Sequence, residues 1–129
     1  MIELELSRII IDENKDEQIV VLKEKGGNRS LPIVIGLNET RAIKLKLSGT
    51  IPPRPLTHDL ISSIIATFGI KLEKIIIDNL IDGTFHAKLY LKTDGMLKIV
   101  DARPSDSIAL ALRANASIFV EEQVLNKLS

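Results

Sequence analysis

The chain has 129 residues and no net formal charge, because 17 lysines and arginines balance 17 aspartates and glutamates. Its 45% apolar and 26% charged residues are typical of one globular domain, which excludes a wholly disordered chain. No apolar run approaches the roughly 20 residues of a membrane span. The absence of cysteine excludes disulfides and Cys-ligated zinc, and the acidic N-terminus does not resemble an export signal, so we expect a cytoplasmic protein.

The first third of the chain has the pattern of β-strands. Apolar and β-branched residues predict strands over residues 3–12, 17–25 and 29–35. Gly26-Gly27 predicts a turn between the second and the third of these strands. Pro32 cannot donate a ladder hydrogen bond, so we expect it at the start of the third strand or on a sheet edge.

Two helices are predicted next. Apolar residues and lysines alternate over residues 43–47 as in a strand, but Asn38 as an N-cap favours a helix that ends near Leu47. Three prolines make residues 51–55 a stiff connector. Thr57 is expected to cap a second helix, whose apolar residues recur at helical spacing: Leu60, Ile61, Ile64, Ile65 and Phe68.

The second half of the chain repeats this succession of elements. The predicted elements are strands over 71–78, 84–92 and 96–100, a helix over 104–115, a strand over 117–120 and a helix over 121–128. The similar order of elements in the two halves is compatible with a duplicated βββαα unit. We therefore predict a single α+β domain over residues 1–129, with a mostly antiparallel or mixed sheet and about four helices.

The segment RPLTHDL, residues 54–60, places several polar groups at a predicted helix N-terminus. Arg54 can bind a phosphate with two hydrogen bonds, and His58 can transfer protons near neutral pH. The helix end itself attracts anions. The alternative is purely structural, with Thr57 as an N-cap, Asp59 as a first-turn acid and Arg54 as a surface charge.

A second polar segment, DARPSDS, also joins a predicted strand to a predicted helix at residues 101–107. Asp101 and Asp106 could bind a divalent metal through oxygen, and Arg103 could neutralise a phosphate. Capping is again the alternative, with Ser105 as an N-cap and Arg103 paired to one of the aspartates.

These segments resemble the bifunctional nuclease domain family. The resemblance is carried by LPIVIG (31–36), RPLTHDL (54–60), DGTFHA (82–87), DARPSDSIALALR (101–113) and SIFV (117–120). It implies an α+β domain of unusual topology, often a homodimer, with nuclease activity on RNA and DNA in some plant members. The family usually has tyrosine at the position of His86 and alanine at that of Ser107. His86 changes the polarity of its strand position, and we expect it on a sheet face rather than as a ligand.

The leading hypothesis is therefore a nuclease acting on RNA or DNA through a local patch. A divalent metal, Mg²⁺ or Mn²⁺, would polarise the phosphate, arginines would stabilise the developing charge, and His58 would serve as general base or acid. The residues assigned are, as catalytic groups, His58, Asp59 and Asp106; as phosphate or anion ligands, Arg54, Thr57, Arg103 and Ser105; and as metal ligands, Asp59, Asp101 and Asp106.

Two other functions are compatible with the same residues. A non-catalytic module that binds an anion or small ligand, or that only dimerises, fits the neutral net charge better than a nuclease does. The 3% aromatic content also argues against an extended stacking platform for single strands. The third reading is that the polar residues serve only as caps and ion pairs. No membrane partner is expected.

Overall fold

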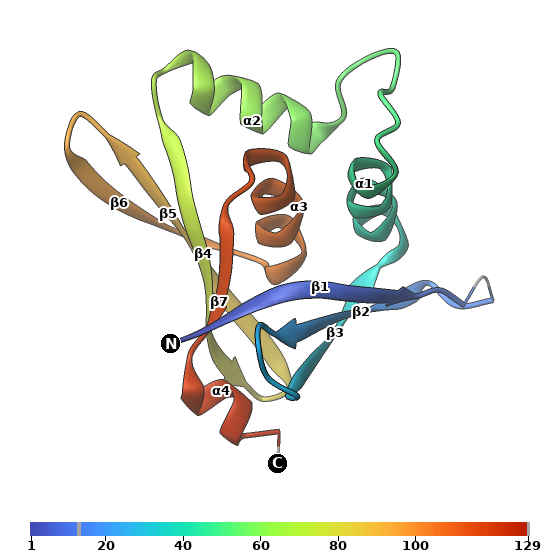
Figure 1. The fold of residues 1–129 in the computed structure, drawn as a ribbon. Coiled ribbons are helices and arrows are strands. Elements are labelled where there is room, and N and C mark those ends of the chain that lie inside the picture. Colours follow the sequence, from blue (N-terminus) through green and yellow to red (C-terminus); the bar gives the residue numbers. More distant parts are fainter. Residues whose placement is uncertain (13, 129) are drawn as a thin grey trace.

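Seven strands and four helices make up the fold over residues 1–12 and 14–128, which the computed structural model describes. In chain order they are β1 (Ile2–Ile10), β2 (Glu17–Glu24), β3 (Ser30–Gly36), α1 (Leu37–Ser48), α2 (Thr57–Thr67), β4 (Lys71–Ile81), β5 (Thr84–Thr93), β6 (Met96–Ala102), α3 (Pro104–Ala114), β7 (Ser117–Val120) and α4 (Glu122–Asn126) (Figure 1). The predicted α+β class is confirmed. No helix of the described part is long and apolar enough to cross a membrane.

All seven strands belong to one sheet, in the order β3-β2-β1-β7-β4-β5-β6. Every neighbouring pair is antiparallel except β4 and β7, which run parallel, so the sheet is mixed. Two three-stranded meanders, β1–β3 and β4–β6, lie on either side of β7, and each is followed by a helix. The halves differ after that helix, because β7 and the five-residue α4 occupy the place that α2 has in the first half.

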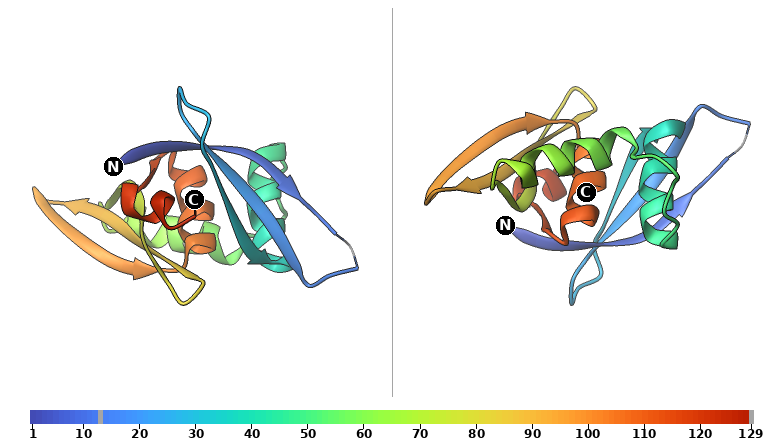
Figure 2. Two further views of the ribbon diagram at one scale, coloured as in Figure 1. Left: turned by 90° about the horizontal axis from the view of Figure 1, so that it is seen from below. Right: turned by 90° about the horizontal axis from the view of Figure 1, so that it is seen from above.

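Three helices cover one side of the curled sheet (Figures 1 and 2). Helix α3 lies in the middle and contacts α1, α2 and the sheet, whereas α4 lies at the other end of the molecule. The central place of α3 explains its composition, since small and branched apolar residues allow close packing. Its buried apolar residues include Ile108, Ala109, Leu110 and Ala111.

Helix α1 resolves the ambiguous alternation of residues 43–47. The helix prediction is confirmed, with Ala42 and Ile43 buried. Asn38 as N-cap is wrong, because Gly36 occupies the N-cap position and the helix begins at Leu37. The side chain of Glu39 folds back over Gly36, where a Cβ atom would collide with Glu39 Oε2.

The predicted caps of α2 and α3 are also one or two residues too late. Leu56 is the N-cap of α2, and Arg103 is the N-cap of α3, so Thr57 and Ser105 lie inside the helices. In α2 the side chain of Asp59 accepts a hydrogen bond from the Leu56 backbone N–H, at 3.0 Å. A cap from within the first turn therefore replaces the expected threonine cap.

Candidate functional site

The two polar segments meet where the N-termini of α2 and α3 come together. His58 Nε2 lies 2.9 Å from Asp106 Oδ1. Arg103 donates two hydrogen bonds to the same carboxylate, from Nε to Oδ2 at 2.8 Å and from Nη2 to Oδ1 at 3.2 Å. Three of the residues selected from the sequence thus form one cluster, which we call the His58–Asp106–Arg103 cluster.

Asp106 is the electrostatic centre of this cluster. Burial acts against its ionised form, but the hydrogen bonds from Arg103 and His58 outweigh burial and hold the pKa of Asp106 below its ordinary value. The same contact raises the pKa of Arg103. A carboxylate without a proton only accepts hydrogen bonds, so Nε2 of His58 carries the hydrogen. In the neutral ring the basic atom is then Nδ1.

Helix α1 supplies two residues that the sequence analysis did not select for the site. Glu39 Oε1 lies 3.2 Å from Arg103 Nη1, and Arg41 lines the same cavity as His58 and Asp106. In the sequence Glu39 has the position of an ordinary acidic residue in the first turn of a helix. Arg41 is one of several charged residues on the same helix. Neither carries a local signal of function, because their approach to α3 depends on tertiary packing.

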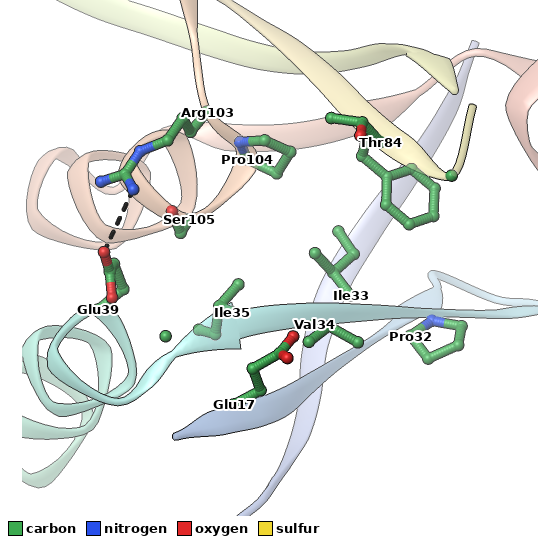
Figure 3. A pocket seen from close by; sticks show the side chains of 13 residues that line it. Glu17, Pro32, Ile33, Val34, Ile35, Glu39, Thr84, Arg103, Pro104 and Ser105 are labelled. Atoms are coloured by element: carbon green, nitrogen blue, oxygen red, sulfur yellow. Dashed lines mark hydrogen bonds and ion pairs between the residues drawn. The ribbon is translucent and has the colours of Figure 1, made fainter. Parts of the chain in front are cut away.

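Two cavities open beside the cluster. The larger, of about 610 Å³, is lined by residues that include Arg41, Thr57, His58, Arg103 and Asp106. The smaller, of about 400 Å³, lies among β3, the start of β5 and the β6–α3 junction, and is shown in Figure 3. The Arg103–Glu39 ion pair lines both cavities and so stands between them.

Asp59 lies apart from the cluster, although it follows His58 directly. Its Oδ1 accepts a hydrogen bond from Arg113 Nε at 2.6 Å, and its Oδ2 accepts the one from Leu56. The Leu56 backbone N–H and the Arg113 guanidinium together lower the pKa of Asp59. It lines a different cavity, of about 280 Å³, with Lys46 and Arg113. Both oxygens therefore have structural partners.

The three predicted metal ligands do not converge. Asp101 is 76% exposed and pairs with Lys88 at 3.1 Å, Asp59 pairs with Arg113, and Asp106 belongs to the cluster. Across residues 1–12 and 14–128 there is no group of three or more histidine, aspartate or glutamate side chains that could hold a metal ion. The arrangement therefore does not fit a metal site built on these three aspartates.

The remaining selected residues are dispersed around the cluster. Thr57 lines the larger cavity, and Ser105, which is buried, lines the smaller one. Arg54 is exposed in the connector before α2 and lines neither of these two cavities. His86 lies in β5 opposite Asn79 and also lines neither.

Comparison with known proteins agrees with the sequence resemblance. An uncharacterized protein of Mycobacterium tuberculosis is 46% identical over 123 residues, which cover 95% of this chain and 73% of that protein. Bifunctional nuclease 1 of Oryza sativa subsp. indica is 23% identical over 116 residues, which cover 88% of this chain but 35% of the rice protein. A model of the bifunctional nuclease domain matches residues 20–129. The chain belongs to the bifunctional nuclease domain family.

Proposed function

We propose that this protein hydrolyses phosphodiester bonds of RNA or DNA at the His58–Asp106–Arg103 cluster. The observation that carries the proposal is the 2.9 Å contact of His58 with a carboxylate that an arginine also holds, beside a cavity with a second arginine. Such a set contains a base, a group that orients it and two cations for a phosphate. Membership of the family and the printed name of the rice relative support the same activity.

In the proposed reaction His58 is the general base. Nδ1 takes a proton from the attacking water as the water oxygen bonds to phosphorus and the bond to the leaving oxygen breaks. The imidazolium then returns that proton to the leaving oxygen. Asp106 keeps the ring in its tautomer and stabilises the imidazolium.

Arg103 and Arg41 would stabilise the negative charge on the phosphoryl oxygens. The Arg103 side chain is 65% exposed, so its ion pairs are screened by water and it can exchange a carboxylate for a phosphate at little cost. Thr57 and Ser105 remain predicted phosphate ligands at the two helix ends. A role for Mg²⁺ or Mn²⁺ also remains a proposal, and no step is assigned to it because the three aspartates lie apart.

The test is degradation of labelled single-stranded RNA and DNA in Mg²⁺, Mn²⁺ or EDTA. We expect His58→Gln and Asp106→Asn to lower the rate by about 100-fold or more, while His86→Gln, a matched histidine outside the cluster, keeps wild-type activity. Circular dichroism checks that each variant folds. Equal rates for wild type and His58→Gln would rule out the mechanism. Wild-type activity that is present in Mg²⁺ or Mn²⁺ and lost in EDTA would establish the metal requirement.

The second candidate is an anion-binding module without catalysis. It is favoured by the exposure of Arg103 beside Arg41 in a chain of zero net charge. In that case the protein binds RNA with a steep loss of affinity as salt rises, and cleaves nothing in any metal. A homodimer and a cytoplasmic location remain predictions, tested by light scattering and by fractionation of the source cells.

A further inference from the structure

Apart from Arg103 and Ser105 at one end, the residues of the smaller cavity have no part in the proposed hydrolysis. Its volume of about 400 Å³ falls within the range of about 300–1,000 Å³ that is usual for small-molecule sites. Figure 3 shows Arg103 and Glu39 together at one end, with Glu17, Pro32 and Thr84 placed farther along the hollow. A ligand here would thus extend away from Arg103.

Apolar groups form much of the wall. Pro32 and Val34 come from edge strand β3, Phe85 from β5 and Pro104 from the start of α3. Val34 is exposed although it is a large apolar residue. An aromatic ring of a ligand could stack on such groups, since flat apolar surfaces attract the faces of nucleobases.

The polar groups of this cavity are mainly acceptors of hydrogen bonds. Glu17 and Glu39 present carboxylates, which accept and do not donate when ionised. Thr84 and Ser105 add hydroxyl groups. Glu17 is exposed, and its carboxylate makes no ion pair within residues 1–12 and 14–128. The carboxylates would repel a phosphate, so a phosphate belongs at the Arg103 end.

We propose that this cavity is a nucleobase subsite that prefers a base with an exocyclic amino group. The proposal rests on the proposed function, in that the adjoining phosphate lies on Arg103. An amino group donates to a glutamate carboxylate, as cytosine N4 does to acidic side chains in DNA recognition. Uracil and thymine carry a carbonyl oxygen at that position, which a carboxylate repels.

Glu39 connects the subsite with the phosphate position. It now pairs with Arg103 at 3.2 Å, and a phosphate that binds Arg103 would release the Glu39 carboxylate. The released group becomes a second acceptor for the amino group of the base. Binding of the phosphate therefore raises the affinity for the base, and binding of the base raises the affinity for the phosphate.

The experiment compares CMP with UMP, which differ in the amino or carbonyl group at one ring position. Wild-type protein labelled with ¹⁵N is titrated in EDTA and followed by NMR. We expect shifts at Val34, Thr84 and Ser105, and at least about tenfold tighter binding of CMP, the factor that corresponds to 1.4 kcal/mol. Equal affinities, or shifts outside this cavity, would overturn the proposal.

Two variants and a cationic probe complete the test. Glu17→Gln is expected to remove most of the preference for CMP, while Glu5→Gln, a matched change on β1 outside this cavity, keeps it. If spermidine binds the same residues more tightly than CMP does, the cavity is an amine site and the proposal fails. This binding measurement does not depend on hydrolysis. A protein that prefers CMP but cleaves no nucleic acid would therefore contradict the nuclease proposal and leave the nucleobase subsite standing.

Discussion

Arg113 Nε donates a hydrogen bond to Asp59 Oδ1 across 2.6 Å and thereby ties the end of α3 to the first turn of α2. The Arg113 side chain is 7% exposed and also donates to the backbone oxygens of Ala109 and Ala42. It therefore links all three helices above the sheet. Because His58 precedes Asp59, the same contact fixes the place of His58 next to Asp106.

Replacement of Arg113 by alanine should destabilise the fold. The change removes the ion-pair partner of Asp59 and one hydrogen bond from each of two helix carbonyl groups, at a cost of about 2–3 kcal/mol in the free energy of unfolding. Urea denaturation measures this. Arg8→Ala, at an exposed position on β1, serves as the control and should stay within about 0.5 kcal/mol of wild type. If the two variants prove equally stable, Arg113 does not hold the helices together.

The stability of the protein should fall in acid through Asp59. Its pKa is lowered in the folded state, so its contribution is fully present above the ordinary aspartate pKa of about 3.9 and disappears as pH falls through the lower folded value. Asp59→Asn should be less stable than wild type at pH 7, and the difference should shrink below pH 4. Asp106 has the same direction of shift and adds to the loss.

The measurement is urea denaturation at pH 7 and pH 3. Asp94→Asn, in the β5–β6 turn, is the control for the loss of one carboxylate away from α2 and α3. A gap between Asp59→Asn and wild type that stays constant with pH would contradict this account.

Gly36→Ala should displace Glu39 without damaging the fold. The new Cβ collides with the end of the Glu39 side chain, which can rotate away, and the backbone of Gly36, at φ −73°, suits alanine. Arg103 then loses one carboxylate partner, so the affinity for single-stranded oligouridylate RNA, whose bases have no amino group to donate to Glu39, should rise a few-fold at low salt, as it should in Glu39→Gln.

Gly27→Ala provides the control for that experiment. Its Cβ would likewise meet a glutamate side chain, that of Glu24, but outside the site. Fluorescence anisotropy with labelled RNA compares the variants. Should Gly27→Ala raise the affinity as much as Gly36→Ala does, the effect would not come from Glu39.

An apolar stripe along α2 and its C-cap residue Phe68 is the candidate surface for the predicted homodimer. Ile61 and Ile65 pack on the core, but Leu60, Ile64 and Phe68 recur every four residues and are exposed, Phe68 to 75%. Such a row of large apolar side chains is typical of a contact with another protein surface. Light scattering should give the mass of a dimer for wild type and of a monomer for Phe68→Glu. The control variant Ile81→Glu, at the end of β4, should remain dimeric. A monomeric wild-type protein would contradict the prediction.

Local sequence patterns were sufficient for the elements but not for their ends. Turn glycines and apolar periodicity predict every strand and helix, and the helix start expected near Asn38 correctly favours a helix over a strand for residues 43–47, although Asn38 itself is not the cap. Asn38 and Thr57 are wrong as caps, because Glu39 and Asp59 reach back over the starts of α1 and α2. Ser105 is wrong as a cap because Pro104 already begins α3, with Arg103 as the N-cap.

The sequence by itself determined the α+β class, the succession of elements and the two polar junctions with His58, Arg103 and Asp106. These depend on neighbours within a few positions along the chain. Tertiary structure alone decided that β7 enters the sheet between the meanders, that Asp59 turns away to Arg113, and that Glu39 and Arg41 join the site. The first outcome depends on the pairing of β7 with β1 and β4, and the other two depend on contacts among α1, α2 and α3. Both kinds of contact join residues far apart in the chain and leave no periodic pattern in the sequence.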